Sequence, residues 1–525
     1  MTVEGSDATA VRERDRPDRG DGRRVSAHVR NGLFVLGALI GLSSLIRLSL
    51  VRSWNYDELS HAHAAWLVSL GAVPYRDFAA NHFPFFWMVL TPLMRVLPQG
   101  SEAMLGLRVL SILLNLVFLC ALGALVLTEV PSRQRIWAAA ALGLVAFSPP
   151  ALHFLIEFRP DALSNALLFS VLLFLRLRDA PGAVSWIASG FCVGAAVLIN
   201  TKYAMFPVVL GSVALILEAR RRRIGPWALA AGLGFGASLL AGRLLLRESG
   251  IPRHSAWRMV VSYNAAAEKA QTFGFGLAHA ILEHPLLLVY IVAGIVGCGV
   301  LFLRERRLPG PLPIGIFCFL VANLATCTRP WKQYVVSWFL LAAYFPARAL
   351  APLAERLRPW AQVAGALGLV VVLTAESTAL GLVDPSGGQE DRATQERLID
   401  WTRGHIPPDD HIAAGFPMHP LFRRDSFYKV IVDMTASGDD GLERLMPGPE
   451  TSLVAGRSLQ SGYELELETR PPALIVLWGL YTDAQVRALS AYTTRHSGDY
   501  VRHNVPGTAL VVLSRKAGAA ERTGR

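Results

Sequence analysis

The stretch from Asn31 to Glu58, NGLFVLGALIGLSSLIRLSLVRSWNYDE, decides the fold class. Residues 31–51 form an apolar run that is long enough to cross a bilayer core, which takes about 20 residues. The run is longer than the core of a signal peptide, and no small-residue cleavage site follows it. It therefore predicts an uncleaved first transmembrane helix.

The rest of the chain repeats this pattern. Of its 525 residues, 52% are hydrophobic and only 17% are charged, whereas an average soluble domain carries about a quarter charged residues. Apolar runs of about 20 residues alternate with short charged stretches, which excludes a soluble enzyme, a disordered chain and a fibrous repeat. Residues 31–382 are predicted to form a polytopic α-helical membrane domain with about eleven transmembrane helices.

The net charge of +11 has a topological explanation. Groups of arginines at residues 220–223, 304–307 and 348–358 each follow an apolar run, as cytoplasmic loops do. This placement argues against a nucleic-acid partner and for a multi-pass protein of the plasma (inner) membrane. Residues 1–30 contain few large apolar side chains and are predicted to be a disordered cytoplasmic segment.

Residues 383–525 differ from the preceding part of the chain. Their polarity is normal, and apolar runs such as residues 473–478 and 508–513 flank a helix-like stretch at residues 483–494. We expect a small C-terminal α/β domain, which the topology places on the extracytoplasmic side.

When the predicted helices are assigned alternately inward and outward, most charges that abut apolar segments fall on the same outer face. Such charges are costly at membrane depth and usually line a polar cavity, so they predict one shared site. The alternative is a set of interfacial side chains and helix-end ion pairs. The residues concerned are Asp57, Glu58, Glu157, Arg159, Asp161, Lys202, Arg329 and Lys332.

The first outer segment, residues 52–105, carries the most informative pattern. Residues 56–70 have helical periodicity, with an apolar stripe suited to the bilayer surface and Asp57 and Glu58 at the helix start. These two carboxylates could simply cap the helix. Asp57 with His61, at i and i+4, or Glu58 with His61, at i and i+3, could instead bind a divalent metal ion with His82, although lone histidines are more often structural.

The same stretch resembles the GT-C superfamily of membrane glycosyltransferases, in particular its protein O-mannosyltransferase and aminoarabinose-transferase branch. The likeness rests on the Asp57-Glu58 pair after the first span and on the motifs that follow it. These are Gly71, Pro74-Tyr75-Arg76-Asp77 and Pro84, then the Arg159-Pro160-Asp161 turn, Thr201-Lys202, the stretch from Arg329 to Tyr334, and the α/β tail. The sequence Asn81-His82-Phe83-Pro84-Phe85 departs from the more usual Lys-Pro-Pro or His-Pro-Pro.

The resemblance implies an inverting transfer of a sugar from a polyprenyl-phosphate donor to a protein, lipid or glycan acceptor. Asp57 matches the family's catalytic position, and Glu58 would orient the acceptor or a metal ion. Cations would meet the lipid phosphate that leaves, and our candidates are Lys202, Arg329, Lys332 and Arg159. The candidates for substrate binding are Tyr75, Asp77, His82, Asp161 and Tyr334.

Two other functional classes remain open. A transporter or flippase of a lipid-linked or anionic substrate also has many spans and charges at membrane depth. Against it, the charges cluster at the outer interface and the chain shows no obvious inverted repeat. A receptor that binds lipid-linked glycans through its tail is the third possibility, but it leaves the Asp57-Glu58 pair without a purpose.

Overall fold

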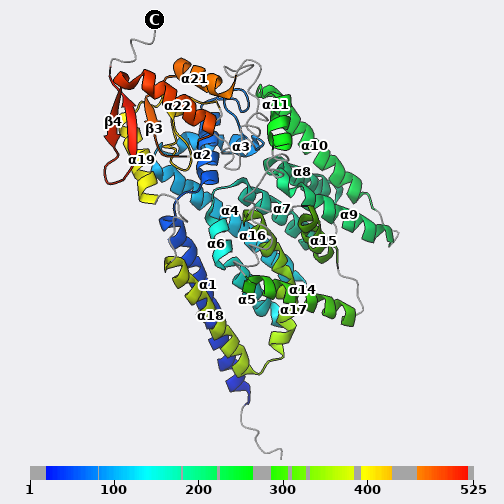
Figure 1. The fold of residues 1–525 in the computed structure, drawn as a ribbon. Coiled ribbons are helices and arrows are strands. Elements are labelled where there is room, and N and C mark those ends of the chain that lie inside the picture. The colour runs from blue at the N-terminus through cyan, green and yellow to red at the C-terminus, as the bar shows by residue number, and fades with distance from the viewer. Residues whose placement is uncertain are drawn as a thin grey trace, which may run out of the picture.

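The computed structural model describes residues 19–80, 82–178, 181–220, 225–263, 285–305, 310–326, 332–382, 392–428, 458–479 and 481–517. For residues 19–24, 202, 263, 305, 324–326, 332–336 and 376–382, it describes the backbone alone. Long helices form a bundle, and a small domain with a sheet covers one end of it (Figure 1).

Each apolar segment that the sequence predicts to cross the membrane is helical in the structure. The helices are α1 (Arg19–Val51), α4 (Ser101–Thr128), α5 (Arg135–Ala146), α6 (Pro149–Ile156), α7 (Pro160–Leu177), α8 (Ala183–Ile199), α9 (Met205–Arg220), α10 (Trp227–Glu248), α14 (Pro285–Glu305), α15 (Pro311–Thr326), α16 (Lys332–Ala342), α17 (Tyr344–Glu355) and α18 (Pro359–Leu382).

Five of these helices, counted over the described part of the chain, are long and apolar enough to cross a membrane. Helices α5 and α6 are bent by 74° relative to each other, and they add a sixth crossing if they form one broken span. Pro149 and Pro150 follow the break and cannot donate the hydrogen bonds that a continuous helix needs. The prediction of a multi-pass membrane protein is confirmed, whereas the number of eleven crossings stays a prediction.

Small residues allow close packing within the bundle. A Cβ atom on Gly190 of α8 would collide with the backbone of Ala231 in α10, and one on Gly234 of α10 would collide with the backbone of Ile187 in α8. These two helices therefore approach each other through their glycine faces, as membrane helices commonly do. Elsewhere, α1 and α18 run side by side although they are far apart in the sequence (Figure 1).

Two further helices lie at the end of the bundle under the C-terminal domain, namely α2 (Tyr56–Ser69) and α3 (Phe85–Val96). The prediction of a helix from Tyr56 is confirmed, but its apolar stripe packs against protein and does not face a bilayer surface. All but one of the residues from Glu58 to Ser69 are buried, on every face of the helix. The reason is that α2 packs on α3 and also on Phe416 and Phe422 of the C-terminal domain.

Over its described residues, the C-terminal domain combines three α-helices with a five-stranded sheet, in agreement with the predicted α/β tail. The elements are α19 (Arg392–His405), β1 (His411–Ala413), β2 (Arg424–Asp425), α21 (Leu459–Thr469), β3 (Leu474–Val476), α22 (Asp483–Arg495), β4 (Tyr500–Asn504) and β5 (Val511–Arg515). The strand order is β2-β1-β3-β5-β4. Strand β1 is parallel to β2 and β3, whereas β5 is antiparallel to β3 and β4.

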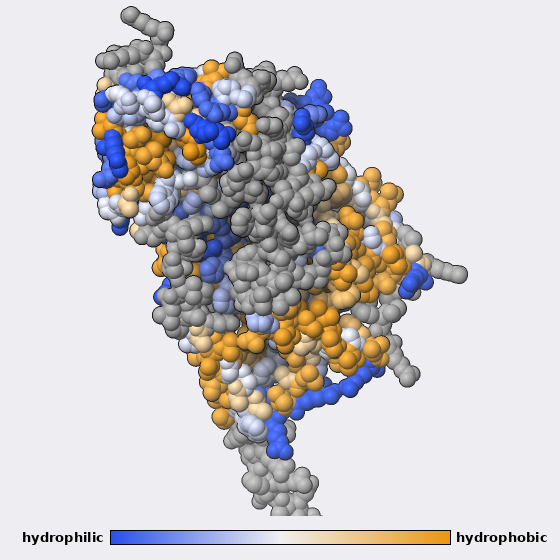
Figure 2. Space-filling view, viewed as in Figure 1, coloured by the Kyte–Doolittle hydropathy of each residue, from blue (hydrophilic) through white to orange (hydrophobic). Residues whose placement is uncertain are grey.

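A continuous hydrophobic core joins this domain to the bundle. Trp54, Trp66 and Trp87 belong to the same buried cluster as Phe416 and Phe422. Figure 2 shows hydrophobic side chains over much of the visible bundle and many of the hydrophilic ones around the end that carries the C-terminal domain. The candidate site lies at this junction between bundle and domain.

Candidate active site

The start of α2 places two carboxylates side by side in the sequence but directs them to different partners. Asn55 caps the helix by accepting a hydrogen bond from the Glu58 backbone N–H (2.9 Å), and Glu58 accepts one from the Asn55 N–H (3.1 Å). This capping box fixes the first turn of α2. Glu58 thus takes part in capping the helix, which is one of the two roles considered for the carboxylates from the sequence. Asp57 is left to point away from the cap.

Glu58 forms a fully buried ion pair with Arg108 of α4. The Nε and Nη2 atoms of Arg108 donate to Glu58 Oε1 (2.8 Å) and Oε2 (2.7 Å), and both side chains are 0% exposed. Phe158 N–H donates to Oε1 as well (3.2 Å). Burial alone would raise the pKa of Glu58, but the charge and hydrogen bonds of Arg108 outweigh it and hold this pKa below its ordinary value.

Arg108 also holds the chain that connects α1 to α2. Its guanidinium donates to the backbone carbonyls of Ser49 (3.0 Å), Arg52 (2.8 Å) and Ser53 (2.8 Å). One buried side chain therefore fixes the end of the first transmembrane helix and the start of α2 at the same time. Sequence reasoning missed Arg108, although a lone arginine inside an apolar run signals a buried partner.

Asp57 joins a second cluster of charges. Its carboxylate pairs with Nη1 of Arg159, which is only 4% exposed, whereas the Asp57 side chain is 30% exposed. Arg159 also contacts Asp161 through Nε (3.3 Å) and lies 3.7 Å from a Glu157 oxygen. Arg52 contacts Glu157 from the other side (2.9 Å). The structure thus brings together Asp57, Arg159 and Asp161, as the shared sidedness predicts.

The members of this cluster differ in their access to solvent. Glu157 and Asp161 are buried, and burial raises the pKa of Glu157 in spite of Arg52 and Arg159. Asp161 lies in the first turn of α7, where a carboxylate also complements the helix dipole. Asp57 is therefore the carboxylate of this cluster that a solute can reach most readily.

Lys202 and Lys332 fall on segments that meet beside this cluster. Lys202 lies in the 3-10 turn Thr201–Ala204, and Lys332 begins α16. The hydroxyl of Tyr203 accepts a hydrogen bond from Asn165 of α7 (3.0 Å) and donates one to Ser337 of α16 (3.5 Å). This contact connects the Lys202 turn with α16 and with the helix that begins at Asp161.

Some of these candidates are described only in part. Arg329 lies outside the described residues, and nothing is described of the side chains of Lys202, Lys332 and Tyr334. Their roles therefore stay predictions.

Tyr75 and Asp77 belong to a tight turn that the C-terminal domain covers. Tyr75 is fully buried with a φ of 64°, its hydroxyl donates to the His82 carbonyl, and its own carbonyl accepts from the Tyr428 hydroxyl (2.9 Å). Asp77 accepts from Val73 N–H (2.7 Å) and from the Arg76 guanidinium. These contacts hold the pKa of Asp77 below its ordinary value, although burial opposes them.

The predicted metal ligands do not form a group of three around Asp57 within the described residues. His61 accepts a hydrogen bond from the Trp87 indole at Nδ1 (3.2 Å), and its ring lies 4.9 Å from that of His82. The carboxylate of Asp57 faces Arg159 instead. The guanidinium between the three carboxylates supplies the positive charge that a divalent ion would bring, so this donor set does not fit a metal ion.

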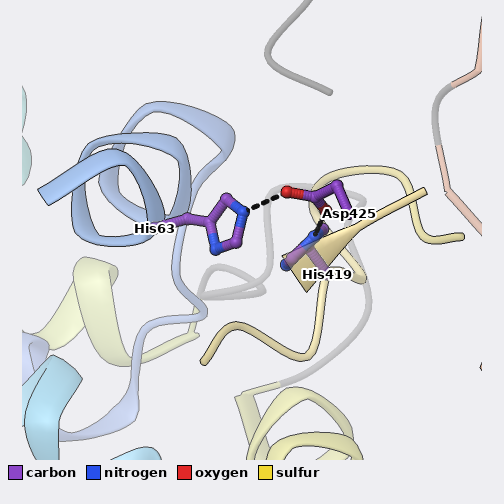
Figure 3. A group of neighbouring side chains, drawn as sticks. All are labelled: His63, His419 and Asp425. Carbon is purple, nitrogen blue, oxygen red and sulfur yellow. Dashed lines mark hydrogen bonds and ion pairs between the residues drawn. The ribbon is translucent and has the colours of Figure 1, made fainter. Parts of the chain in front are cut away.

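His63, His419 and Asp425 form a separate buried group between α2 and β2 (Figure 3). Asp425 Oδ2 lies 2.6 Å from His63 Nε2, and Asp425 Oδ1 lies 2.8 Å from His419 Nε2. Ligands of a tetrahedral zinc ion would stand about 3.3 Å apart. The Leu421 N–H donates to His419 Nδ1 (3.0 Å), so the ring proton sits on Nε2 and points at Asp425.

The group in Figure 3 is therefore a hydrogen-bonded bridge that fastens the C-terminal domain to α2. Burial and the neighbouring His63 lower the pKa of His419 to about 4. The two imidazoles outweigh burial and lower the pKa of Asp425 to about 2. Sequence reasoning missed this bridge because no local pattern relates His63 to a histidine and an aspartate of the distant tail.

The geometry defines a multi-pass membrane protein with buried charges at one end of its helix bundle. No protein-family model and no curated protein matches the sequence. Its structure is similar to ArnT from Cupriavidus metallidurans bound to undecaprenyl phosphate, with 13% sequence identity and a TM-score of 0.60 over 93% of this chain and 98% of that one.

A second similar structure is the archaeal oligosaccharyltransferase AglB from Archaeoglobus fulgidus in complex with an inhibitory peptide and a dolichol-phosphate. The identity is 12% and the TM-score 0.52 over 94% of this chain and 74% of that one. Both proteins belong to the GT-C superfamily, so the chain has the GT-C fold that the sequence resemblance predicts.

Proposed function

We propose that the protein is an inverting glycosyltransferase that moves a sugar from a polyprenyl-phosphate donor to an acceptor hydroxyl. The observation that carries this proposal is the accessible carboxylate of Asp57, paired with the buried Arg159 at one end of a GT-C fold. The structures of its two relatives contain undecaprenyl phosphate and dolichol-phosphate. We place the site and the C-terminal domain outside the plasma (inner) membrane and the N-terminus in the cytoplasm.

Asp57 acts as the general base in this proposal. Its carboxylate accepts the proton of the acceptor hydroxyl while the oxygen attacks the anomeric carbon from the face opposite the phosphate. The new C–O bond forms as the bond to the phosphate oxygen breaks, and the polyprenyl phosphate leaves with that electron pair. Arg159 pairs with Asp57 and fixes the direction of its carboxylate.

Glu58 takes a positioning role instead of contacting an acceptor or a metal ion. A carboxylate offers about four lone-pair sites. Four donors already occupy Glu58, namely two N–H groups of Arg108 and the backbone N–H groups of Asn55 and Phe158. We therefore assign Glu58 to holding the first turn of α2, and thereby Asp57, in place.

Negative charge develops on the leaving phosphate and must be stabilised by cations. The sequence contains no nucleotide-binding motif that would do this, so the task falls to single basic side chains. We propose Lys202, Arg329 and Lys332 for this task, since the turn that carries Lys202 contacts α16 and α7 next to the Asp57 cluster. Arg159 acts mainly on Asp57 and Asp161.

The substrate contacts are divided by accessibility. Tyr75 and Asp161 are buried and support the site through other residues, whereas the half-buried His82 is available beside His61. Tyr334 remains a proposed contact.

The proposal is tested with full-length protein in membrane vesicles and a panel of undecaprenyl-phosphate sugars. Mass spectrometry should detect release of undecaprenyl phosphate and a glycosylated acceptor with at least one donor. The Asp57→Asn variant should lose this release, and Asp400→Asn, a matched change at an exposed residue of α19, should retain it. Movement of intact donor lipid across the vesicle without release would instead identify a flippase and refute the proposal.

A further inference from the structure

A cavity of about 350 Å³ lies where the C-terminal end of α2 meets the C-terminal domain. Phe78 and Phe427 contribute apolar walls, and Arg424, Arg470 and His411 contribute polar ones. Its volume is in the range of small-molecule sites, which combine apolar walls with a few fixed polar groups.

This cavity is separate from the Asp57 cluster. Asp57 lies in the first turn of α2, and Leu70, which lines the cavity, follows the last turn. Thirteen helical steps of 1.5 Å place the two positions about 20 Å apart along the helix. A group bound in the cavity is therefore not the group that reacts at Asp57, and the inference below does not depend on the proposed function.

The acidic groups that line the cavity already have hydrogen-bonding partners in the protein. Asp77 receives two hydrogen bonds from Arg76 (2.9 and 2.8 Å) and one from the Val73 N–H (2.7 Å). Asp425 is bound by His63 and His419 on its two oxygens (2.6 and 2.8 Å). Arg76 and the two histidines therefore occupy these carboxylates, and the charge of Arg470 acts on Asp77 without a hydrogen bond between them.

The two arginines, in contrast, have no such partner. Throughout the described part of the chain, the side chains of Arg424 and Arg470 form no hydrogen bond and no ion pair, although both line the cavity. The positive charges of Arg424 and Arg470 both act on His411. Burial, together with the charges of Arg470 and Arg424, lowers the pKa of His411, which also lines the cavity.

We propose that this cavity is a binding site for an anionic group, a phosphate or a carboxylate, on a ligand of sugar size. Two guanidinium groups supply the paired donors that match either oxyanion. Phe78 and Phe427 would contact the apolar face of the attached ring. Because β1, β2 and the end of α21 supply the cationic side, the C-terminal domain is a ligand-binding part of the protein.

Calorimetric titration of the full-length protein in detergent tests this inference. The probes are glucose 1-phosphate, glucuronate, inorganic phosphate and uncharged methyl glucoside. We expect binding of at least one anionic sugar and none of methyl glucoside. The ratio between glucose 1-phosphate and glucuronate then tells which oxyanion is preferred, and inorganic phosphate reports how much the sugar ring contributes.

Variants locate the binding. Arg424→Gln with Arg470→Gln should weaken binding by about tenfold or more, whereas Arg502→Gln, at an exposed arginine of β4 outside the cavity, should leave it unchanged. A Phe427→Leu variant shortens the apolar wall and should weaken the sugar phosphate more than inorganic phosphate. Equal affinity in the double variant, equal binding of methyl glucoside, or no binding of any anion would each overturn the inference.

Discussion

Removal of the Arg108 guanidinium is the sharpest test of how the site is held. In the Arg108→Met variant, Glu58 keeps its buried carboxylate but loses the two N–H donors at 2.8 and 2.7 Å. The carbonyls of Ser49, Arg52 and Ser53 lose their donors as well. Removing one partner of a buried ion pair costs about 3–5 kcal/mol.

Glu58→Gln provides the second side of a double-mutant cycle. This variant leaves the charge of Arg108 buried, but the three backbone carbonyls still accept from it. We therefore expect a smaller loss, of about 2–3 kcal/mol. The variant with both changes should be more stable than the sum of the two losses predicts, by about 2–3 kcal/mol, because neither charge is then left without its partner.

Unfolding in mixed detergent, followed by tryptophan fluorescence, measures these differences in the free energy of unfolding. The chain has 12 tryptophans, among them the fully buried Trp54 four residues before Glu58, so fluorescence reports unfolding of the whole protein. Leu113→Ala, at an exposed position of the same helix α4, is the control and should change stability little. Strictly additive losses, or an Arg108→Met variant as stable as the parent protein, would refute the role of this pair.

Two further predictions concern the domain junction and the bundle. Folding lowers the pKa of His419 from 6.5 to about 4, so the unfolded chain binds more protons than the folded protein between these pH values. The free energy of unfolding should therefore be highest above pH 6.5 and fall by up to about 3 kcal/mol as the pH drops to 4. A thermal midpoint that stays constant over this range would contradict the prediction. In the bundle, Gly190→Val should separate α8 from α10 and lower the thermal midpoint by several degrees. The control Gly236→Val places its side chain in open space and should change the midpoint little. Equal effects of the two variants would contradict the close approach of α8 and α10.

The sequence predicts most of the helix positions, because the length and polarity of an apolar run determine where a chain can cross a membrane. It also predicts that Asp57, Arg159 and Asp161 belong to one site, because charged side chains at the same side and depth of a membrane usually pair or line a shared polar cavity. The break between α5 and α6 was not predicted from the sequence, although Pro149 and Pro150 are a local signal for it. These features depend on local properties of the chain.

Other features depend on contacts between segments that are distant in the sequence. Glu58 looks like a second catalytic carboxylate until Arg108 of another helix fills its remaining sites. The apolar stripe of α2 fits a bilayer surface equally well as a protein interior, and only the packing of Phe416 and Phe422 decides between them. The bridge of His63, His419 and Asp425 likewise has no signal in either segment alone.

The central claim is that Asp57 is the base in sugar transfer from a polyprenyl phosphate, and one measurement tests it most directly. Single-turnover release of undecaprenyl phosphate is compared between the parent protein and Asp57→Asn, with donor affinity measured on the same samples. We predict a loss of about 10²–10⁴-fold in the rate with donor affinity little changed, because the carboxylate acts on the acceptor proton. A folded Asp57→Asn variant that releases undecaprenyl phosphate at the parent rate would contradict the claim.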